Sequence, residues 1–538
     1  MLARARRMVR WGLVALVVLL VSGVVLADRL TPRATGAPAQ ALPVVAGQTA
    51  LDREIAPILA RQPPGTTGAL LVPDGLDAFA ARAISARQAG RSLDLMYYIW
   101  HDDLTGRLLA REAWLAAERG VRVRLLLDDI NALGKDTALL ALDAHPNIEV
   151  RAYNPFRNRG GLGRLYEMGQ RLFSLNHRMH NKAWIADNRV AVVGGRNIGV
   201  EYFAASHESN FHDLDLVLFG PAVAQASAVF DTFWNSDAVV PLASLNRAGA
   251  DERAAVAAAI RAEAQGPEAR RYLDRVDGSP TVRAYLAQGL APFYGDRLRI
   301  VSDPPVKAGA ASRAGWLVGE IERSLAGAHH KALVVSPYFV PGDAGTALLA
   351  GLARRGVQTG VVTNSLASND VAAVYGGYSK YRPGLLQAGV RLYEIRAQAA
   401  PAATGASAAP TGSGSGGVPG SGGAGSGTGA SLHTKAFVVD DARGFIGSFN
   451  MDPRSAALNT EMGVFFDHPG MAAALRREYL HLAGPALSDW VYLDAGGHVR
   501  WLDRTAVPPR VLDVSPGSTR TQRLQATAAR WLPIESQL

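Results

Sequence analysis

The chain of 538 residues contains no cysteine. Disulfide bonds, thiolate metal sites, cysteine nucleophiles and an acylated cysteine anchor are therefore excluded. Lysine is also scarce, because the sequence has only six lysines among its 56 basic residues and the other 50 are arginines. A pattern that uses lysine at the same place twice is therefore more informative here than in an average protein.

The residues that are abundant suit a globular protein with an anionic partner. Apolar residues make up 48% of the chain and aromatic residues 7%, which is typical of a protein with a packed core. The net charge of +9 favours lipid head groups or nucleic acid as partners. Part of this charge lies in four arginines close to the N-terminus, so the charge alone does not choose between the two.

One pattern occurs twice: His-x-Lys-x4-Asp, followed by a glycine and then by an asparagine three places after it. The two copies consist of His180, Lys182, Asp187, Gly194 and Asn197, and of His433, Lys435, Asp440, Gly447 and Asn450. In an extended strand, residues two apart point to the same side, so each copy places an imidazole beside an ammonium group. The apolar runs on either side of each Asp predict a β-hairpin in both copies.

The repeat is longer than this motif. Residues 92–128 read as a strand, a helix that ends in Arg-Gly and a second strand, and residues 331–364 repeat the same order. Such strand, helix, strand units build parallel sheets. We therefore expect an α/β protein made of two similar halves.

The duplicated motif resembles that of the phospholipase D superfamily, whose members pair two such motifs to build one active site, and the resemblance implies phosphodiester cleavage. This reaction needs a nucleophile, an acid for the leaving oxygen, and cations around the phosphoryl oxygens. Two histidines and two lysines on one site supply all of these groups with no metal and no cofactor. The histidines need opposite protonation states, so their surroundings must differ. His207 and His212, near Glu208, match no metal-ligand spacing, and we predict no metal site.

Within the superfamily, the stretches TNSLASNDVAAVYGGYSKYR and IGSFNMDPRSAALNTEMG are similar to bacterial cardiolipin synthases, in particular their type C branch. The resemblance implies two pseudo-symmetric phospholipase D-like α/β sandwich domains that are packed around one shared active site. It also implies that His180 is the nucleophile and His433 the acid and base, with Lys182 and Lys435 on the phosphoryl oxygens, although the sequence itself is symmetric on this point.

Several polar residues are expected to assist. Asn197 and Asn450 are candidate substrate-binding residues. The superfamily places a carboxylate beside each histidine, and Asp213 or Asp215 and Glu461 match those positions. The motif includes Asp187 and Asp440 among the candidate catalytic residues, but their position in hairpin turns favours a role in stabilising the turn or the interface between the halves.

The resemblance implies a membrane-associated phosphatidyltransferase. It would transfer a phosphatidyl group from a second phospholipid, with phosphatidylethanolamine as one candidate, to phosphatidylglycerol and so make cardiolipin through a phosphohistidine. The type C branch also implies help from an accessory protein. One alternative is a phospholipase D that hydrolyses phospholipid to phosphatidic acid. Another is an exported phosphodiesterase or nuclease, which is less favoured because residues 157–164 are the only basic cluster near the motifs.

The chain divides into six predicted segments. An apolar run over residues 11–27 follows four arginines, which predicts a membrane anchor or signal peptide over 1–28, with the catalytic domains outside the cytoplasm at the inner membrane of a bacterium. The remaining segments are a linker over 29–60, a first phospholipase D-like domain over 61–245, a helical connector over 246–285, a second such domain over 286–505 with an Ala/Gly/Ser/Pro-rich insertion at 397–430, and a tail over 506–538. In the tail, Leu524, Ala528 and Trp531 share a helical face, which is compatible with an interfacial helix or with an ordinary packed terminus.

Overall fold

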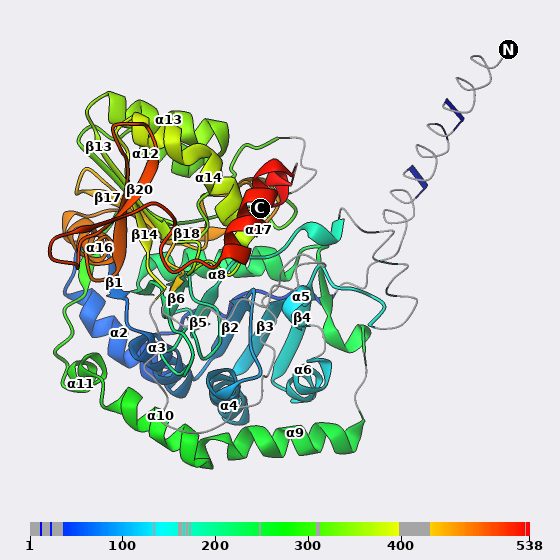
Figure 1. Cartoon of the computed structure of the whole chain (residues 1–538). Coiled ribbons are helices and arrows are strands. Elements are labelled where there is room, and N and C mark those ends of the chain that lie inside the picture. The colour runs from blue at the N-terminus through cyan, green and yellow to red at the C-terminus, as the bar shows by residue number, and fades with distance from the viewer. Residues whose placement is uncertain are drawn as a thin grey trace.

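The computed structural model describes residues 36–538 except 133–134, 160–163, 165–166, 168–170, 172–173, 247–248, 308–311, 398–430 and 533, together with residues 11, 12, 15, 22 and 23. The predicted N-terminal membrane segment and the predicted insertion lie almost entirely outside these described residues. Among the described residues, no helix combines the length and the apolar character needed to cross a bilayer. The described residues form two large sheets with helices on both faces (Figure 1), together with one two-stranded sheet.

The first sheet has the strand order β10-β1-β8-β6-β5-β2-β3-β4-β9. Strands β2, β3 and β4 are parallel, whereas β5, β6 and β8 run antiparallel to their neighbours. The strands are β1 (Thr67–Val72), β2 (Ser92–Tyr97), β3 (Arg122–Asp128), β4 (Ile148–Tyr153), β5 (Ala183–Ala186), β6 (Val190–Gly194), β8 (Asp215–Phe219), β9 (Val239–Pro241) and β10 (Phe293–Gly295).

The second sheet has the strand order β11-β18-β17-β16-β12-β13-β14-β19-β20-β21, and its six strands from β18 to β14 repeat the directions of β8 to β4 in the first sheet. The strands are β11 (Leu298–Ser302), β12 (Lys331–Val335), β13 (Gln358–Asn364), β14 (Arg391–Ile395), β16 (Ala436–Val439), β17 (Arg443–Gly447), β18 (Met462–Asp467), β19 (Ser488–Leu493), β20 (Val499–Asp503) and β21 (Arg510–Leu512). The expectation of two similar α/β halves is thereby confirmed, as are both motif hairpins, β5-β6 and β16-β17.

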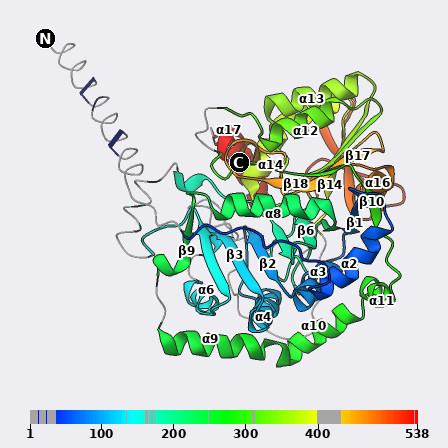
Figure 2. The ribbon, with the colours of Figure 1, turned by 180° about the vertical axis from the view of Figure 1, so that it is seen from behind.

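The helices form three layers, one on the outer face of each sheet and one between the two sheets. The outer helices are α3 (Gly75–Gln88), α4 (Leu104–Glu118) and α6 (Asp136–Asp143) on the first sheet, and α12 (Leu317–Ala326), α13 (Gly342–Arg354) and α14 (Ala372–Gln387) on the second. Between the sheets lie α8 (Pro221–Trp234) and α16 (Pro469–Leu482), and a single apolar core joins them to both sheets (Figures 1 and 2). The halves are therefore packed together through shared buried surface rather than tethered.

The remaining elements connect or cover these layers. Figure 1 shows the helices of residues 250–286 along the outside of the first half, in the segment predicted as a connector. The elements are α2 (Ala50–Ala60), α5 (Asp129–Ala132), α9 (Ala250–Ala262), α10 (Pro267–Asp277), α11 (Pro280–Leu286), α15 (Pro453–Ala457), α17 (Arg520–Trp531), β7 (Phe211–His212) and β15 (Ser431–Leu432).

The motif aspartates fasten the hairpin turns. Asp187 adopts a positive φ of 54°, and its carboxylate accepts hydrogen bonds from the backbone N–H groups of Gly90, Arg91 and Ser92 at 3.0, 2.7 and 3.0 Å. Asp440, with φ of 52°, accepts the corresponding N–H groups of residues 329–331 at the start of β12. Each Asp lies at the opposite end of its strand from the motif histidine. This geometry favours the structural role of the two aspartates over a chemical one.

We expect Asp187→Ala to lower stability, because three buried or partly buried N–H groups lose their acceptor. The loss should be at least about 2 kcal/mol, which thermal unfolding would register as a lower apparent Tm. Asp102→Ala is a matched control, since the Asp102 side chain is 60% exposed and should leave the Tm unchanged. An unchanged Tm together with abolished turnover in Asp187→Ala would assign the residue to the chemistry instead.

Candidate active site

The two motif histidines lie in the seam between the halves, and each is bonded through its backbone to the opposite half. The N–H of His180 donates to the carbonyl of Thr460 at 2.9 Å, and the N–H of His433 donates to the carbonyl of His212 at 2.8 Å. The short strands β7 and β15 extend the second of these contacts into a parallel pair. The residue after each of these carbonyls is a carboxylate, Glu461 or Asp213.

The residue before each histidine is held by a polar side chain at the end of a central parallel strand. Asp128 ends β3 and accepts the N–H of Met179 at 2.8 Å. Asn364 ends β13, and its side chain both accepts from and donates to the backbone of Leu432 at 3.0 Å. The two strands therefore fix equivalent points of the two motifs.

Each motif histidine is bonded to a carboxylate from the opposite half. Nδ1 of His180 lies 2.8 Å from Glu461, and Nδ1 of His433 lies 2.5 Å from Asp213, so each histidine is bonded to an acid of the other half. Of the two alternatives near residue 214, the structure places Asp213 at the histidine. Asp215 instead forms ion pairs with the buried guanidinium groups of Arg82 and Arg196. With Nδ1 occupied in both rings, Nε2 is the atom left for a substrate.

The two histidine and acid pairs differ in their surroundings. Glu461 also accepts hydrogen bonds from the hydroxyls of Ser448 and Ser455, at 2.5 and 2.9 Å. Asp213 accepts no such hydroxyl among the described residues, and its further bond comes from the backbone N–H of Leu214 at 2.8 Å. Gly195 takes the place of Ser448 in the first half, and a Cβ added there would lie 2.2 Å from the Asp213 carboxylate.

Burial dominates the protonation of the site. It lowers the pKa of His180 and of His433 well below the usual value, and the charges of Lys182 and Lys435 lower both further. Burial also lowers the pKa of Lys182, and it lowers that of Lys435 to about 8. Without an anion in the site, both imidazoles are therefore neutral at pH 7.

The carboxylates respond to burial in the opposite direction. Burial raises the pKa of Asp213, and it raises that of Glu461 to about 7, although nearby lysines oppose both changes. Burial thus shifts the pKa of the two lysines and of the two carboxyl groups toward the neutral form of each. A phosphodiester anion beside the lysines would favour their charged form.

Each motif lysine is held by a backbone carbonyl of its own motif. Nζ of Lys182 donates to the carbonyl of His180 at 2.6 Å, and Nζ of Lys435 donates to the carbonyl of His433 at 2.5 Å. Each side chain is only 1% exposed. Because an ammonium group has three hydrogens, each lysine retains two for a ligand.

The motif asparagines are alike in sequence but not in contacts. The amide of Asn197 donates to the hydroxyl of Tyr202 at 2.9 Å and accepts the N–H of Ile99 at 3.3 Å. Asn450 is only 5% exposed, and its Oδ1 has no partner among the described residues. The geometry thus favours Asn450 as a ligand for substrate, while Asn197 orients Tyr202.

Aromatic rings wall the site, and the sequence analysis missed them. The ring of Tyr98 meets that of His180 edge-on at 5.0 Å and lies 5.4 Å from Nζ of Lys182. Tyr202 meets His433 edge-on at 5.1 Å, and Phe211 stacks on it at 5.4 Å. Their positions after β2, after the first motif and in β7 become meaningful only once the halves meet, so no local pattern marks them.

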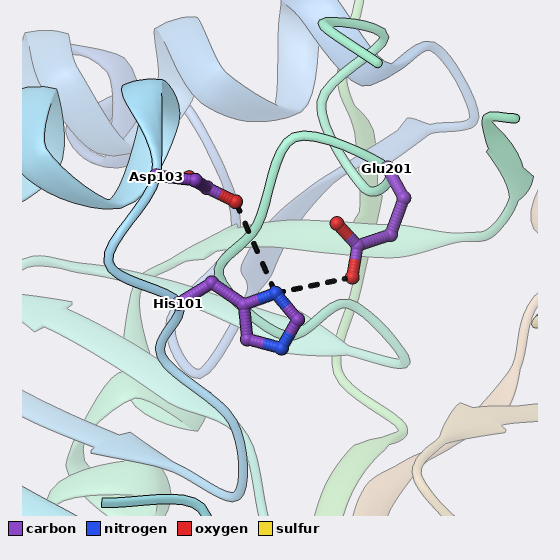
Figure 3. Close-up of side chains that lie close together, drawn as sticks. All are labelled: His101, Asp103 and Glu201. Carbon is purple, nitrogen blue, oxygen red and sulfur yellow. Dashed lines mark ion pairs between the residues drawn. The ribbon is translucent and has the colours of Figure 1, made fainter. Parts of the chain in front are cut away.

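One cluster outside the seam contains groups that bind metals, namely His101, Asp103 and Glu201 (Figure 3). Nδ1 of His101 lies 3.5 Å from Glu201 and 3.9 Å from Asp103. Asp103 is already used structurally, because one oxygen caps α4 at Gly106 and the other accepts the N–H of Val200. The cluster therefore ties the start of α4 to the segment that follows Asn197.

Comparisons with known proteins show the family and the fold of the chain. The family model described as "Cardiolipin synthase, PLD-like domain" matches residues 84–234 and 321–483. The chain is 39% identical over 481 residues to cardiolipin synthase C of Escherichia coli K12, which covers 89% of this chain and 97% of that protein. It is 32% identical over 441 residues to an uncharacterized protein of Helicobacter pylori 26695, covering 80% and 81%. The crystal structure of phosphatidylserine synthase from Haemophilus influenzae covers 90% of this chain and 99% of its own, with 14% identity and a TM-score of 0.54, which shows a similar fold.

The difference between Gly195 and Ser448 yields a matched pair of substitutions. Gly195→Ala should displace Asp213 from His433. Phosphodiester cleavage should then be about a hundredfold slower, because one positioned acid-base group contributes a rate factor of this order. Ser448→Ala removes one hydrogen bond from Glu461 and should cost roughly tenfold or less. Hydrolysis of bis(p-nitrophenyl) phosphate measures both. Equal losses would mean that the two carboxylates are interchangeable.

The lowered pKa of Lys435 predicts an alkaline limit. Since the ammonium form binds anions and Lys435 loses its proton as the pH rises through about 8, kcat/KM should fall above that pH. The guanidinium of Lys435→Arg keeps its charge at this pH. The variant should be less active than the wild type, but its kcat/KM should not fall near pH 8. A limit that stays near pH 8 in this variant would assign the titration to another group.

Proposed function

Because the chain belongs to the cardiolipin synthase family with phospholipase D-like domains, we propose that it moves a phosphatidyl group from one phospholipid to phosphatidylglycerol and so makes cardiolipin. The observation that carries this proposal is the pair of histidines with crossed carboxylates, flanked by two buried lysines. The identity to cardiolipin synthase C over nearly the whole of both chains supports the choice of lipid substrate.

In the first step, Nε2 of neutral His180 attacks the phosphorus of the donor lipid. The P–O bond to the head-group alcohol breaks, and His433 gives its proton to the departing oxygen. The product is a phosphatidyl group bonded covalently to His180. Lys182, Lys435 and Asn450 bind the non-bridging oxygens, where the negative charge of the transition state develops.

The unequal carboxylates support this division of roles. Glu461 shares its charge with two serine hydroxyls, so it stabilises an imidazolium at His180 less well. Asp213 accepts no side-chain hydroxyl among the described residues, and it therefore stabilises a protonated His433 better. The phosphodiester anion adds to this effect, since it raises the pKa of the ring that faces the leaving oxygen. His180 thus acts as the nucleophile and His433 as the acid.

In the second step, the terminal hydroxyl of phosphatidylglycerol gives its proton to His433 and attacks the same phosphorus. The bond between phosphorus and Nε2 of His180 breaks, and cardiolipin leaves with His180 neutral and His433 protonated. Water can replace the lipid hydroxyl, and the product is then phosphatidic acid. Transfer wins only where lipid is abundant and water is excluded, which the aromatic walls of Tyr98, Tyr202 and Phe211 favour.

The proposal also covers the cellular location of the enzyme, its donor lipid and an accessory protein. We assign the enzyme to the inner membrane of a bacterium with its catalytic halves outside the cytoplasm, on the basis of the N-terminal apolar run after four arginines. Phosphatidylethanolamine is the second donor that we propose to test. An accessory protein belongs to the same proposal, since the resemblance to the type C branch implies one.

The deciding experiment is lipid mass spectrometry on membranes that contain the full chain, supplied with phosphatidylglycerol with or without phosphatidylethanolamine. Cardiolipin should form with the wild-type protein and be absent with His180→Ala. His433→Asn should accumulate the covalent intermediate, seen as protein label from a phosphate-labelled donor. Phosphatidic acid as the sole product would replace the transferase by a hydrolase, and cardiolipin formation by His180→Ala would refute the mechanism.

A further inference from the structure

Helix α17 turns its large apolar side chains away from the protein. Leu524 and Trp531 are 71% and 82% exposed, whereas Ala526 and Ala529 are buried and lie against Gly376 of α14. Figure 1 shows α17 beside α14 at the C-terminal end of the chain. A helix that only packs on its own protein buries its large residues and exposes polar ones. The reverse arrangement indicates that the outer face of α17 meets something else.

The outer face of α17 is defined here as Arg520, Leu524, Ala528 and Trp531, which lie at successive turns on one side of the helix. All four are exposed, as is Arg530 on its flank. Residues 514–534 contain three arginines and no acidic residue. Neither Arg520 nor Arg530 has a carboxylate partner within the described part of the chain, so both are available to an anion.

The segment that follows α17 is bonded to residues near the seam. Beyond α17 the chain ends at Leu538, whose backbone oxygen accepts the N–H of Arg454 at 2.8 Å. The guanidinium of Arg454 in turn donates to the backbone oxygen of Asn176 at 2.8 Å, four residues before His180. The chain that carries α17 is thus bonded on both sides of the active-site seam.

We propose that the outer face of α17 docks on an anionic phospholipid bilayer and so presents the seam to lipid. This inference rests on the proposed function for the choice of a lipid surface. Trp and Leu side chains enter the boundary between head groups and acyl chains, and arginines bind lipid phosphates. The absence of acidic residues from this stretch matches an anionic surface and disfavours a zwitterionic one.

The absence of cysteine makes a direct test practical, because any cysteine introduced is the sole thiol. Ala528→Cys in the full chain is labelled with the environment-sensitive dye NBD, and the protein is reconstituted into phosphatidylcholine vesicles with or without phosphatidylglycerol. The matched control is Ala287→Cys, an exposed alanine beside Leu286, which is itself 72% exposed, at the end of α11 in the connector. Helices α17 and α11 lie far apart in both ribbon views (Figures 1 and 2).

With phosphatidylglycerol present, we expect the dye at 528 to become brighter, to be quenched by doxyl-labelled lipid and to be protected from aqueous iodide. The dye at 287 should show none of these changes. Arg520→Glu with Arg530→Glu, or a high salt concentration, should reduce the protection at 528, since screening weakens the attraction of exposed charges. The double variant Leu524→Ser with Trp531→Ser should reduce the protection of the dye at 528 to that of the dye at 287.

Equal iodide quenching at 528 and 287 in vesicles that contain phosphatidylglycerol would overturn the proposal and leave this face for a protein partner. Equal protection with and without phosphatidylglycerol would overturn its electrostatic part. The labelled variant is also measured with His180→Ala, which removes turnover. If the labelled His180→Ala protein still docks, docking does not depend on turnover. The docking proposal and the proposed reaction can then be refuted independently.

Discussion

The crossed bonds between histidine and carboxylate are the constraint on which the rest of the structure depends. A neutral imidazole is useful only if one nitrogen is fixed so that the other faces the phosphorus, and here the fixing group comes from the other half. The seam must therefore be rigid. The shared apolar core around α8 and α16 and the backbone bonds at Thr460 and His212 provide that rigidity. Packing between the halves is thus part of the chemistry.

The electrostatics of the seam follow from the same geometry. Two lysines, two acids and two histidines are withdrawn from water together, and burial shifts each of them toward its neutral form. Such a group is costly to assemble. An anionic substrate beside the lysines would favour their charged form, so substrate binding and lysine protonation are coupled.

Much of this could be predicted from the sequence, because strand period, hairpin turns and the order of strands and helices are local properties. The hairpins at β5-β6 and β16-β17 and the repeated α/β halves followed directly from residue patterns. The choice between Asp213 and Asp215 could not be made, since both lie in one apolar stretch and only the seam separates them. The contrast between Asn197 and Asn450, the aromatic walls and the crossing itself likewise depend on contacts between distant segments.

The crossing also bears on how such a chain can change over time. A substitution at Glu461 alters the environment of His180 in the other half, and one at Asp213 alters that of His433. A substitution in one half therefore affects the chemistry of the other half, so the two halves cannot change independently. The small departures from symmetry, such as glycine at 195 opposite serine at 448, leave both crossed bonds in place and still give the two histidines different surroundings.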